Sequence, residues 1–232
     1  ALALALVLGK RIGFQKGIQK PHNVPLVLLG AAILWFGWFG FNAGAEWLNG
    51  LANTGLIVLN TIGATAAGVL GWIVVEKFKD GKATSVGAAS GAVTGLVAIT
   101  PACANLTPGW ALLLGLIAGI ACAYAVELKF KFGFDDSLDV VGIHLVGGLI
   151  GTLYLGFFAT ETGLFVGGGL EQLVLQAVAA IGVLAYSFAL AFAIGFAVEK
   201  TMGFRVKNAD EIAGVDTAMH GEEGYALVEE RV

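Results

Sequence analysis

The chain has 232 residues, of which 57% are hydrophobic and only 13% are charged. A water-soluble domain carries about 25% charged residues, so the composition excludes an ordinary soluble protein and indicates an integral membrane protein. The formal net charge of -4 comes with no basic arm and no basic stripe interleaved with aromatic residues, which argues against a nucleic-acid partner.

The first residues, ALALALVLG, form an apolar run that ends at Lys10 and Arg11. A signal peptide carries its positive charge before the apolar region and a cleavage site after it, so this run is not interpreted as one. A helix over residues 1–9 reaches only about 14 Å, well short of a ~30 Å hydrocarbon core. The run is interpreted as the end of a spanning helix, and the chain is expected to be truncated at its N-terminus.

Six further apolar runs are long enough to cross a bilayer. They lie at about residues 24–45, 52–76, 84–104, 110–128, 136–158 and 171–198. Because the runs are apolar on every side, they predict helices rather than the alternating strands of a membrane barrel. The sequence therefore predicts an all-α integral membrane protein, a multi-span helical bundle over residues 1–202, followed by a polar tail over residues 203–232.

The positive charges support this segmentation. When the loops are assigned alternately to two sides, every Lys and Arg, including Lys16 and Arg231, falls on one side. That side receives residues 10–23, 76–83, 129–135 and 199–232, and the other receives 46–51, 105–109 and 159–170. Lys and Arg accumulate in cytoplasmic loops, so the first side, with the C-terminus, is predicted to be cytoplasmic.

Glycines recur at four-residue spacing within the predicted helices. The pairs and triplets are Gly87, Gly91 and Gly95, then Gly115 and Gly119, then Gly147 and Gly151. In lipid, glycine lets helix backbones approach closely, so these residues predict a tightly packed bundle. Cys103 and Cys122 lie in apolar surroundings and are interpreted as small buried hydrophobic residues.

The run ILWFGWFGFNAG, from Ile33 to Gly44, concentrates aromatic residues on one spanning helix. Trp35, Trp38 and Phe41 have the spacing of one helical face, and Trp38 and Phe41 are predicted to lie near the outer surface. One interpretation is an aromatic belt that anchors the helix at the interface. The other is a cation–π site for a small cation that is losing its water.

His144 is the one imidazole inside the last-but-one apolar run, about 12 Å along that helix from Asp136. It is predicted to share a helical face with Ser137, Val140, Gly147 or Gly148, and Gly151. An ionisable side chain at this depth marks a conduction path or proton relay, whereas the alternative is a structural hydrogen bond to a neighbouring helix. Asp135, Asp136 and Asp139 are expected in the first turns, capping the helix, with Asp139 the deepest.

The segments KPHNVPLVLLGAAILWFGWFGFNAG and DDSLDVVGIHLVGGLIG together closely resemble the ammonium transporters of the Amt/Mep/Rh family. ITPACA and the tail GFRV…AGVD…HGEEGY resemble its bacterial members. The resemblance covers essentially the whole chain and implies ammonium or ammonia transport through a narrow hydrophobic pore, with ammonium deprotonated at the outer mouth. It implies no cofactor and no enzymatic activity.

The family's subunits have eleven helices and form homotrimers, so the chain is expected to run from the end of the fifth helix through the eleventh. By resemblance, His144 matches the second of the paired pore histidines, and Trp38 and Phe41 match a pore Trp and a gate Phe. Val140 matches a pore-wall residue and Asp139 the aspartate of the tenth helix.

Asn42 and Ala45 are expected to support the outer site, and Ala45 stands where many members have a Ser. The other pore histidine, the second gate Phe, the recruitment-site Trp and a buried Asp would all lie upstream of Ala1. The resemblance therefore implies that these residues alone do not form a complete pore.

Two alternatives remain open. A sensor or receptor would use the same fold, with its signal carried by the tail. A rhomboid-like intramembrane serine protease would use Ser90 and His144, although Ala88 occupies the place of that motif's first glycine.

The polar tail is either a solvated terminus or, by resemblance, a segment that docks on the cytoplasmic face and contacts a PII-type regulator. Its acidic residues are Asp210, Glu211, Asp216, Glu222 and Glu223. His220 in the tail is interpreted as exposed, and His22 as a loop residue.

Overall fold

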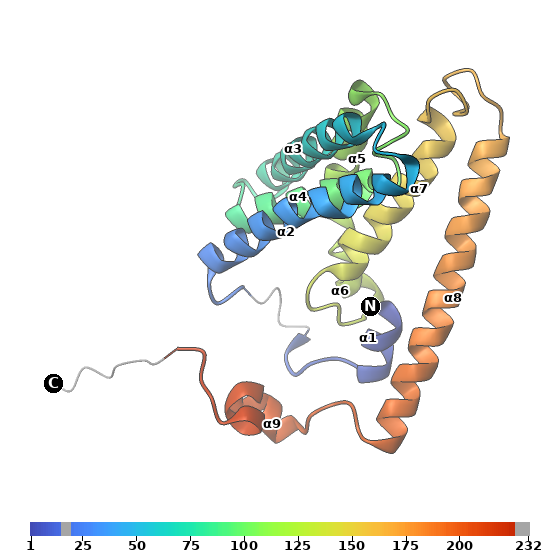
Figure 1. Ribbon diagram of the computed structural model, residues 1–232. Helices are drawn as coiled ribbons and strands as arrows, with labels where there is room; N and C mark the ends of the chain where they lie inside the picture. Colours follow the sequence, from blue (N-terminus) through green and yellow to red (C-terminus); the bar gives the residue numbers. More distant parts are fainter. Residues whose placement is uncertain (15–19, 226–232) are drawn as a thin grey trace.

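A computed structural model describes residues 1–14 and 20–225, and within these ranges the chain is helical with no strand. Lys16, Arg231 and the last residues of the tail lie outside the described ranges. The predicted all-α membrane architecture is confirmed. Figure 1 shows a bundle of helices on one side of the molecule and one long helix standing beside it.

Five helical segments have the length and apolar composition to cross a membrane. They are Val24–Asn49 (α2, Val24–Ala45, with η2, Glu46–Asn49), Thr54–Lys79 (α3), Pro108–Phe132 (α5, Pro108–Ala125, with α6, Leu128–Phe132), Val141–Phe158 (η3, Val141–Leu145, with α7, Val146–Phe158) and Glu171–Thr201 (α8). The shorter elements are α1 (Leu2–Leu8), α4 (Ser85–Ile99), α9 (Asn208–Ala213) and η4 (Asp216–His220).

The run predicted at 84–104 is a shorter helix than expected, because α4 ends at Ile99. Thr100 keeps right-handed helical backbone angles, but Pro101 has no N–H with which to continue the helical hydrogen bonds. The chain therefore leaves the helix after Thr100 and continues to Asn105 in turns, with the Ala102 N–H donating to the Ile99 carbonyl. At its other end the Thr84 side chain caps α4 by accepting a hydrogen bond from the Gly87 N–H at 2.8 Å.

The helix predicted from residue 136 begins later and irregularly. It opens with the π-turn η3, in which the Val146 N–H donates to the Val141 carbonyl five residues back. Asp135, Asp136 and Asp139 therefore precede the helix rather than occupying its first turns. Asp139 has a φ of 58°, a left-handed conformation that non-glycine residues adopt rarely.

Helices α3, α4 and α5 pack most closely, and their glycines explain why. A Cβ on Gly95 would lie 2.5 Å from the Ala64 carbonyl oxygen, and one on Gly119 would lie 2.3 Å from the Gly68 oxygen. These helices are thus in backbone contact, as the glycine spacing predicted. Gly87 differs, because it faces the carboxylate of Glu76 instead of another backbone.

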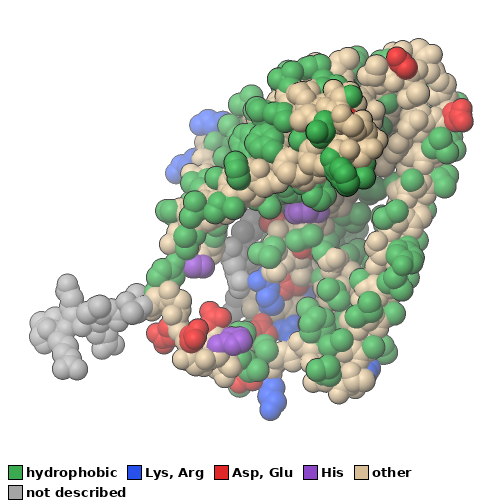
Figure 2. Space-filling model, in the orientation of Figure 1, with side chains coloured by type: hydrophobic (Ala, Val, Ile, Leu, Met, Phe, Trp, Pro, Cys, Tyr) green, Lys and Arg blue, Asp and Glu red, His purple; other side chains and the backbone are tan. Residues whose placement is uncertain are grey.

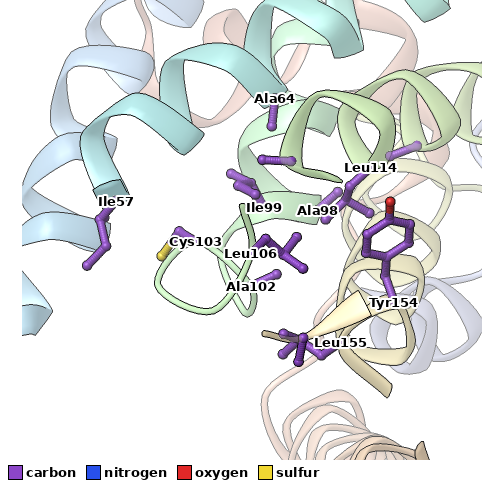
Figure 3. Close-up of a cluster of buried hydrophobic side chains, with 13 residues drawn as sticks. Ile57, Ala64, Ala98, Ile99, Ala102, Cys103, Leu106, Leu114, Tyr154 and Leu155 are labelled. Carbon is purple, nitrogen blue, oxygen red and sulfur yellow. The ribbon is translucent and has the colours of Figure 1, made fainter. Parts of the chain in front are cut away.

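The main hydrophobic core lies where α3, α4 and α5 meet α7. Figure 3 shows Ala64 of α3, Ala98 and Ile99 of α4, and Tyr154 and Leu155 of α7 pointing toward one another. Cys103 belongs to this cluster, and Cys122 belongs to a second one with Trp72 and Ile143. Both cysteines are buried and free, as apolar core residues should be.

Helix α8 is 31 residues long and contacts mainly α7 and α1. None of its most apolar 18-residue window is buried. In Figure 2 the Lys and Arg side chains lie along the left and lower parts of this face, whereas the end near the α7–α8 connection carries acidic side chains. Acidic side chains also lie beside Lys and Arg at the lower left, so the placement of Lys and Arg alone follows the alternating assignment of loops.

Candidate functional site

His144 opens into a cavity between α1, η3 and α8. The cavity has a volume of about 470 Å³, and its lining includes His144, Val140 and Val141 together with Ala3 of α1 and Phe188 of α8. The His144 side chain is exposed to this space rather than packed in the helical core. Val140 and His144, predicted to share a face, do line the same cavity.

The predicted placement of Ser137, Gly147 and Gly151 on the His144 face is wrong. Gly147 and Gly151 turn toward α4 and α5, where a Cβ on Gly151 would lie 2.0 Å from the Ala98 carbonyl oxygen. Ser137 precedes the helix and lines a different cavity beside the tail. The π-turn is the physical reason, because it places one extra residue in a turn and separates His144 from the glycines that follow it.

Trp38 and Phe41 form an aromatic pair on α2, with ring centroids 5.6 Å apart. The Trp38 indole N–H donates a 2.7 Å hydrogen bond to the Thr100 hydroxyl at the end of α4. Phe41 is 65% exposed, so its ring presents an open apolar surface. Neither residue lines the cavity of His144.

Asn42 is buried one residue after Phe41 and faces α3. Its amide donates a 3.1 Å hydrogen bond to the Thr61 hydroxyl, while its side-chain oxygen has no partner among the described residues. Ala45 is exposed and marks the end of α2. The next residue, Glu46, is buried, and its carboxylate accepts hydrogen bonds from the backbone and side-chain amides of Asn53.

Lys129 organises the turn that begins the His144 helix. Its side chain is 10% exposed and lies 2.5 Å from the Asp139 carboxylate, and its ammonium also donates to the Asp136 carbonyl. The Asp136 carboxylate accepts from the N–H groups of Val140 and Val141 at 3.1 and 2.6 Å and so caps the helix. Burial raises the pKa of Asp139, although Lys129 opposes this shift.

The sequence reasoning treated Lys129 only as a cytoplasmic charge. The sequence signal for the Lys129–Asp139 ion pair is a basic residue ten positions before an acidic one, with a tight turn at Gly133 between them. The predicted capping role is confirmed for Asp136, while Asp139 acts as an ion-pair partner instead.

The protease alternative requires Ser90 and His144 to meet. Ser90 lines a cavity of about 530 Å³ with Glu76, Lys79 and Lys129 at the α3–α4 connection. His144 lines the separate cavity beside α8. The structure therefore does not bring these two side chains into one site.

The start of the tail is docked on the N-terminal segment. Arg205 donates hydrogen bonds to the Leu8 carbonyl at 3.0 Å and to the Glu211 carboxylate at 2.6 Å. Glu211 also accepts from the Ile12 N–H at 2.7 Å, and this bond, followed by Arg205, lowers the pKa of its carboxyl. His220 is exposed, and His22 precedes α2 and contacts the Tyr225 hydroxyl at 2.9 Å.

Arg11 connects the N-terminal segment to the loop before the His144 helix. Its guanidinium makes 2.8 Å hydrogen bonds to both carboxylate oxygens of Asp135, whose side chain is only 2% exposed. Burial alone would raise the pKa of Asp135, but the hydrogen bonds from Arg11 outweigh it and hold the pKa below its ordinary value. The charged form of Asp135 therefore stabilises the folded chain.

This arrangement predicts a specific acid sensitivity. The stabilisation is fully present above the ordinary carboxyl pKa of about 3.9 and is lost as the pH falls through the lower folded-state value. We expect the melting temperature of the Asp135→Asn variant to fall less than that of the unmodified protein when the pH is lowered through this range, because the variant has no carboxylate at residue 135 to protonate. The exposed Asp80→Asn change is the control and should follow the unmodified protein. Equal acid sensitivity of the Asp135→Asn variant and the unmodified protein would contradict the assignment.

Comparison with known proteins identifies the family. The sequence model of the Ammonium Transporter Family matches residues 1–225. The chain belongs to the Ammonium Transporter Family. An ammonium transporter from Mycobacterium tuberculosis is 51% identical over 238 residues, covering 97% of this chain and 50% of the relative.

Solved structures of Ammonium Transporter Family proteins share the fold. A structure titled sensor Amt protein superposes with a TM-score of 0.83 at 32% identity, covering 94% of this chain and 56% of that one. Mep2 of Candida albicans superposes with a TM-score of 0.81 at 31% identity, covering 90% of this chain and 50% of that one. The matching family is a family of transporters and the Mycobacterium tuberculosis relative is named an ammonium transporter, so the intramembrane-protease alternative is not supported. The chain spans about half the length of the mycobacterial relative.

Proposed function

We propose that the protein transports ammonium nitrogen across the cytoplasmic membrane through a narrow hydrophobic pore, with ammonium losing a proton at the outer mouth. The observation that carries the proposal is the exposure of the His144 ring to a cavity between α1, η3 and α8 that is lined mainly by apolar residues, in a chain of this family. An ionisable side chain in such a position is costly and marks a transport path.

The chemistry follows from solvation. Moving an ammonium ion into a hydrocarbon-like environment carries a large desolvation cost, and loss of the proton removes most of it. A neutral imidazole offers one hydrogen-bond donor and one acceptor, so it can pass ammonia along or relay a proton without creating a fixed charge. Potassium has no proton to lose, so a dry pore rejects it.

The outer site is assigned to Trp38 and Phe41, whose ring pair offers a cation–π surface and whose Trp is held by Thr100. Asn42 supports it with a buried side-chain oxygen that has no partner among the described residues, and Ala45 leaves the end of α2 without a hydroxyl. His144 and Val140 form the pore wall deeper in the membrane. Asp139 supports the start of the pore helix through Lys129.

The assembly is proposed to be a homotrimer, with residues 1–202 in the membrane and the tail from residue 203 on the cytoplasmic side. The restriction of Lys and Arg to one set of loops supports this orientation. The tail, docked through Arg205 and Glu211, is the proposed contact for a PII-type regulatory protein.

The proposal is tested with a chimera in which this chain replaces the matching half of the Mycobacterium tuberculosis relative. We expect the chimera to restore growth on low ammonium to a strain without ammonium uptake and to carry ammonium into proteoliposomes. A chimera that inserts in the membrane and binds ammonium without transporting it would instead support the sensor alternative.

A further inference from the structure

The π-turn η3 lies in the stretch of the helix that carries His144. Such turns add one residue to an otherwise regular helix, and they are frequent at functional sites. Gly142 and Gly147 both contact neighbouring helices and are five positions apart in the chain. In a regular α-helix, residues three or four positions apart lie on one face. The extra residue of the π-turn accommodates the fifth position.

Gly142 is buried against the end of α5. A Cβ at Gly142 would lie 2.7 Å from the Val126 Cα and 2.8 Å from its backbone nitrogen. Backbone atoms cannot swing aside as a flexible side chain can, so only glycine fits at residue 142. The start of the His144 helix is thereby pressed onto α5.

Gly147 and Gly151 place the continuation of the helix against α5 again and against α4. A Cβ on Gly147 would lie 3.5 Å from the Cys122 sulfur of α5, and one on Gly151 would lie 2.0 Å from the Ala98 carbonyl oxygen of α4. A regular α-helix would not turn residues 142 and 147 toward the same neighbour, since five residues exceed one turn by more than a full residue. The π-turn allows both contacts at once.

His144 lies between these contacts and points away from them. Gly142, two residues earlier, is buried against Val126, whereas the His144 ring is exposed to the cavity beside α1 and α8. The Asp136 carboxylate holds the N–H groups of Val140 and Val141, so the turn is fixed at its start as well. The ring direction is therefore set by packing on the opposite side of the helix.

We propose that the π-turn, with Gly142 packed on Val126, is a positioning device that points the His144 ring into the cavity. Gly142 and Val126 are positioning residues, because they act on the transported molecule only through the imidazole. The inference rests on the proposed transport function for its purpose, while the geometry it describes is measurable without transport.

The geometric test uses His144→Cys as a reporter and methyl methanethiosulfonate, a small uncharged reagent, as the probe. Adding Gly142→Ala should slow labelling of this cysteine several-fold, because the new methyl group forces the turn away from α5 and rotates residue 144. Gly148→Ala is the matched control on the same helix, since its Cβ has no neighbour nearer than 3.9 Å, at a Val97 methyl. Equal labelling rates in the two variants would overturn the proposal.

A second variant covers the case in which Gly142→Ala does not fold. Deletion of Val141 removes the extra residue and permits a regular helix, and it too should slow labelling. Unchanged labelling in the deletion variant would overturn the proposal. If neither variant folds, the π-turn is required for folding and not specifically for the orientation of the His144 ring, and the proposal is overturned as well.

Transport by the chimera then separates this inference from the proposed function. Gly142→Ala should lower the maximal ammonium uptake rate and leave KM near its original value, because the Trp38 and Phe41 pair is untouched. If labelling slows while uptake proves independent of His144, the positioning is correct and the transport role of His144 is wrong. If uptake depends on His144 but labelling is unaffected, the positioning role is wrong and the transport role stands.

Discussion

Replacing His144 by leucine is expected to lower ammonium transport by the chimera by about 100-fold, the lower end of what a positioned proton-transfer group contributes. Leucine removes the only ionisable side chain that the described residues contribute to the lining and leaves the Ser187 hydroxyl as the polar side-chain group there. Ammonia then loses the imidazole as donor and acceptor, and because a serine hydroxyl does not titrate in this range, no proton can be relayed through this position. The measurement is the ammonium-dependent current across proteoliposomes, recorded with ammonium and then with potassium.

The control for this experiment is His220→Leu, which makes the same substitution on an exposed residue of the tail. That variant should keep the current and the selectivity of the unmodified chimera. An unchanged current and an unchanged ratio of ammonium to potassium in the His144→Leu variant would remove His144 from the mechanism.

Gly115→Ala is expected to destabilise the bundle strongly. The new Cβ would lie 2.1 Å from the Ala64 carbonyl oxygen and 2.7 Å from the Ala64 Cα, so α3 and α5 have to separate. Overpacking of this kind costs about 1–3 kcal/mol. We expect the free energy of unfolding in detergent to fall by an amount in this range.

Gly109→Ala is the matched control because it lies on the same helix with nothing within 4 Å of its Cβ. There the substitution should be neutral or slightly stabilising, since alanine favours a helix more than glycine does. Equal loss of stability in the two variants would show that α5 tolerates methyl groups on either side, and that the contact with Ala64 does not hold the bundle.

The membrane architecture could be predicted from the sequence because it depends on the hydropathy of long runs and on the positions of many Lys and Arg residues. Apolar runs and the sorting of Lys and Arg survive errors at single positions, and the glycine spacing correctly indicated helices in backbone contact. The early end of α4 also has a local signal, since Pro101 has no N–H for a helical hydrogen bond. The apolar run continues through Cys103, so hydropathy alone extends the predicted helix beyond the proline.

The site could be predicted less completely. His144 and Val140 line one cavity as expected, but their separation from Gly147 and Gly151 depends on the π-turn. No local propensity distinguishes a hydrogen bond to the fifth residue from one to the fourth, and here the choice is made by packing between Gly142 and Val126. The pairing of Lys129 with Asp139 likewise depends on a chain reversal whose geometry a linear pattern does not specify.

The length of α8 has a consequence for the membrane in which the protein works. Its 31 residues extend for about 46 Å, whereas the hydrocarbon layer of a bilayer is about 30 Å thick. The helix must cross obliquely or project beyond the layer, and it is held mainly by contacts with α1 and α7. Lipids with longer or shorter acyl chains will therefore change the inclination of α8 and, with it, the width of the cavity that Phe188 shares with the imidazole.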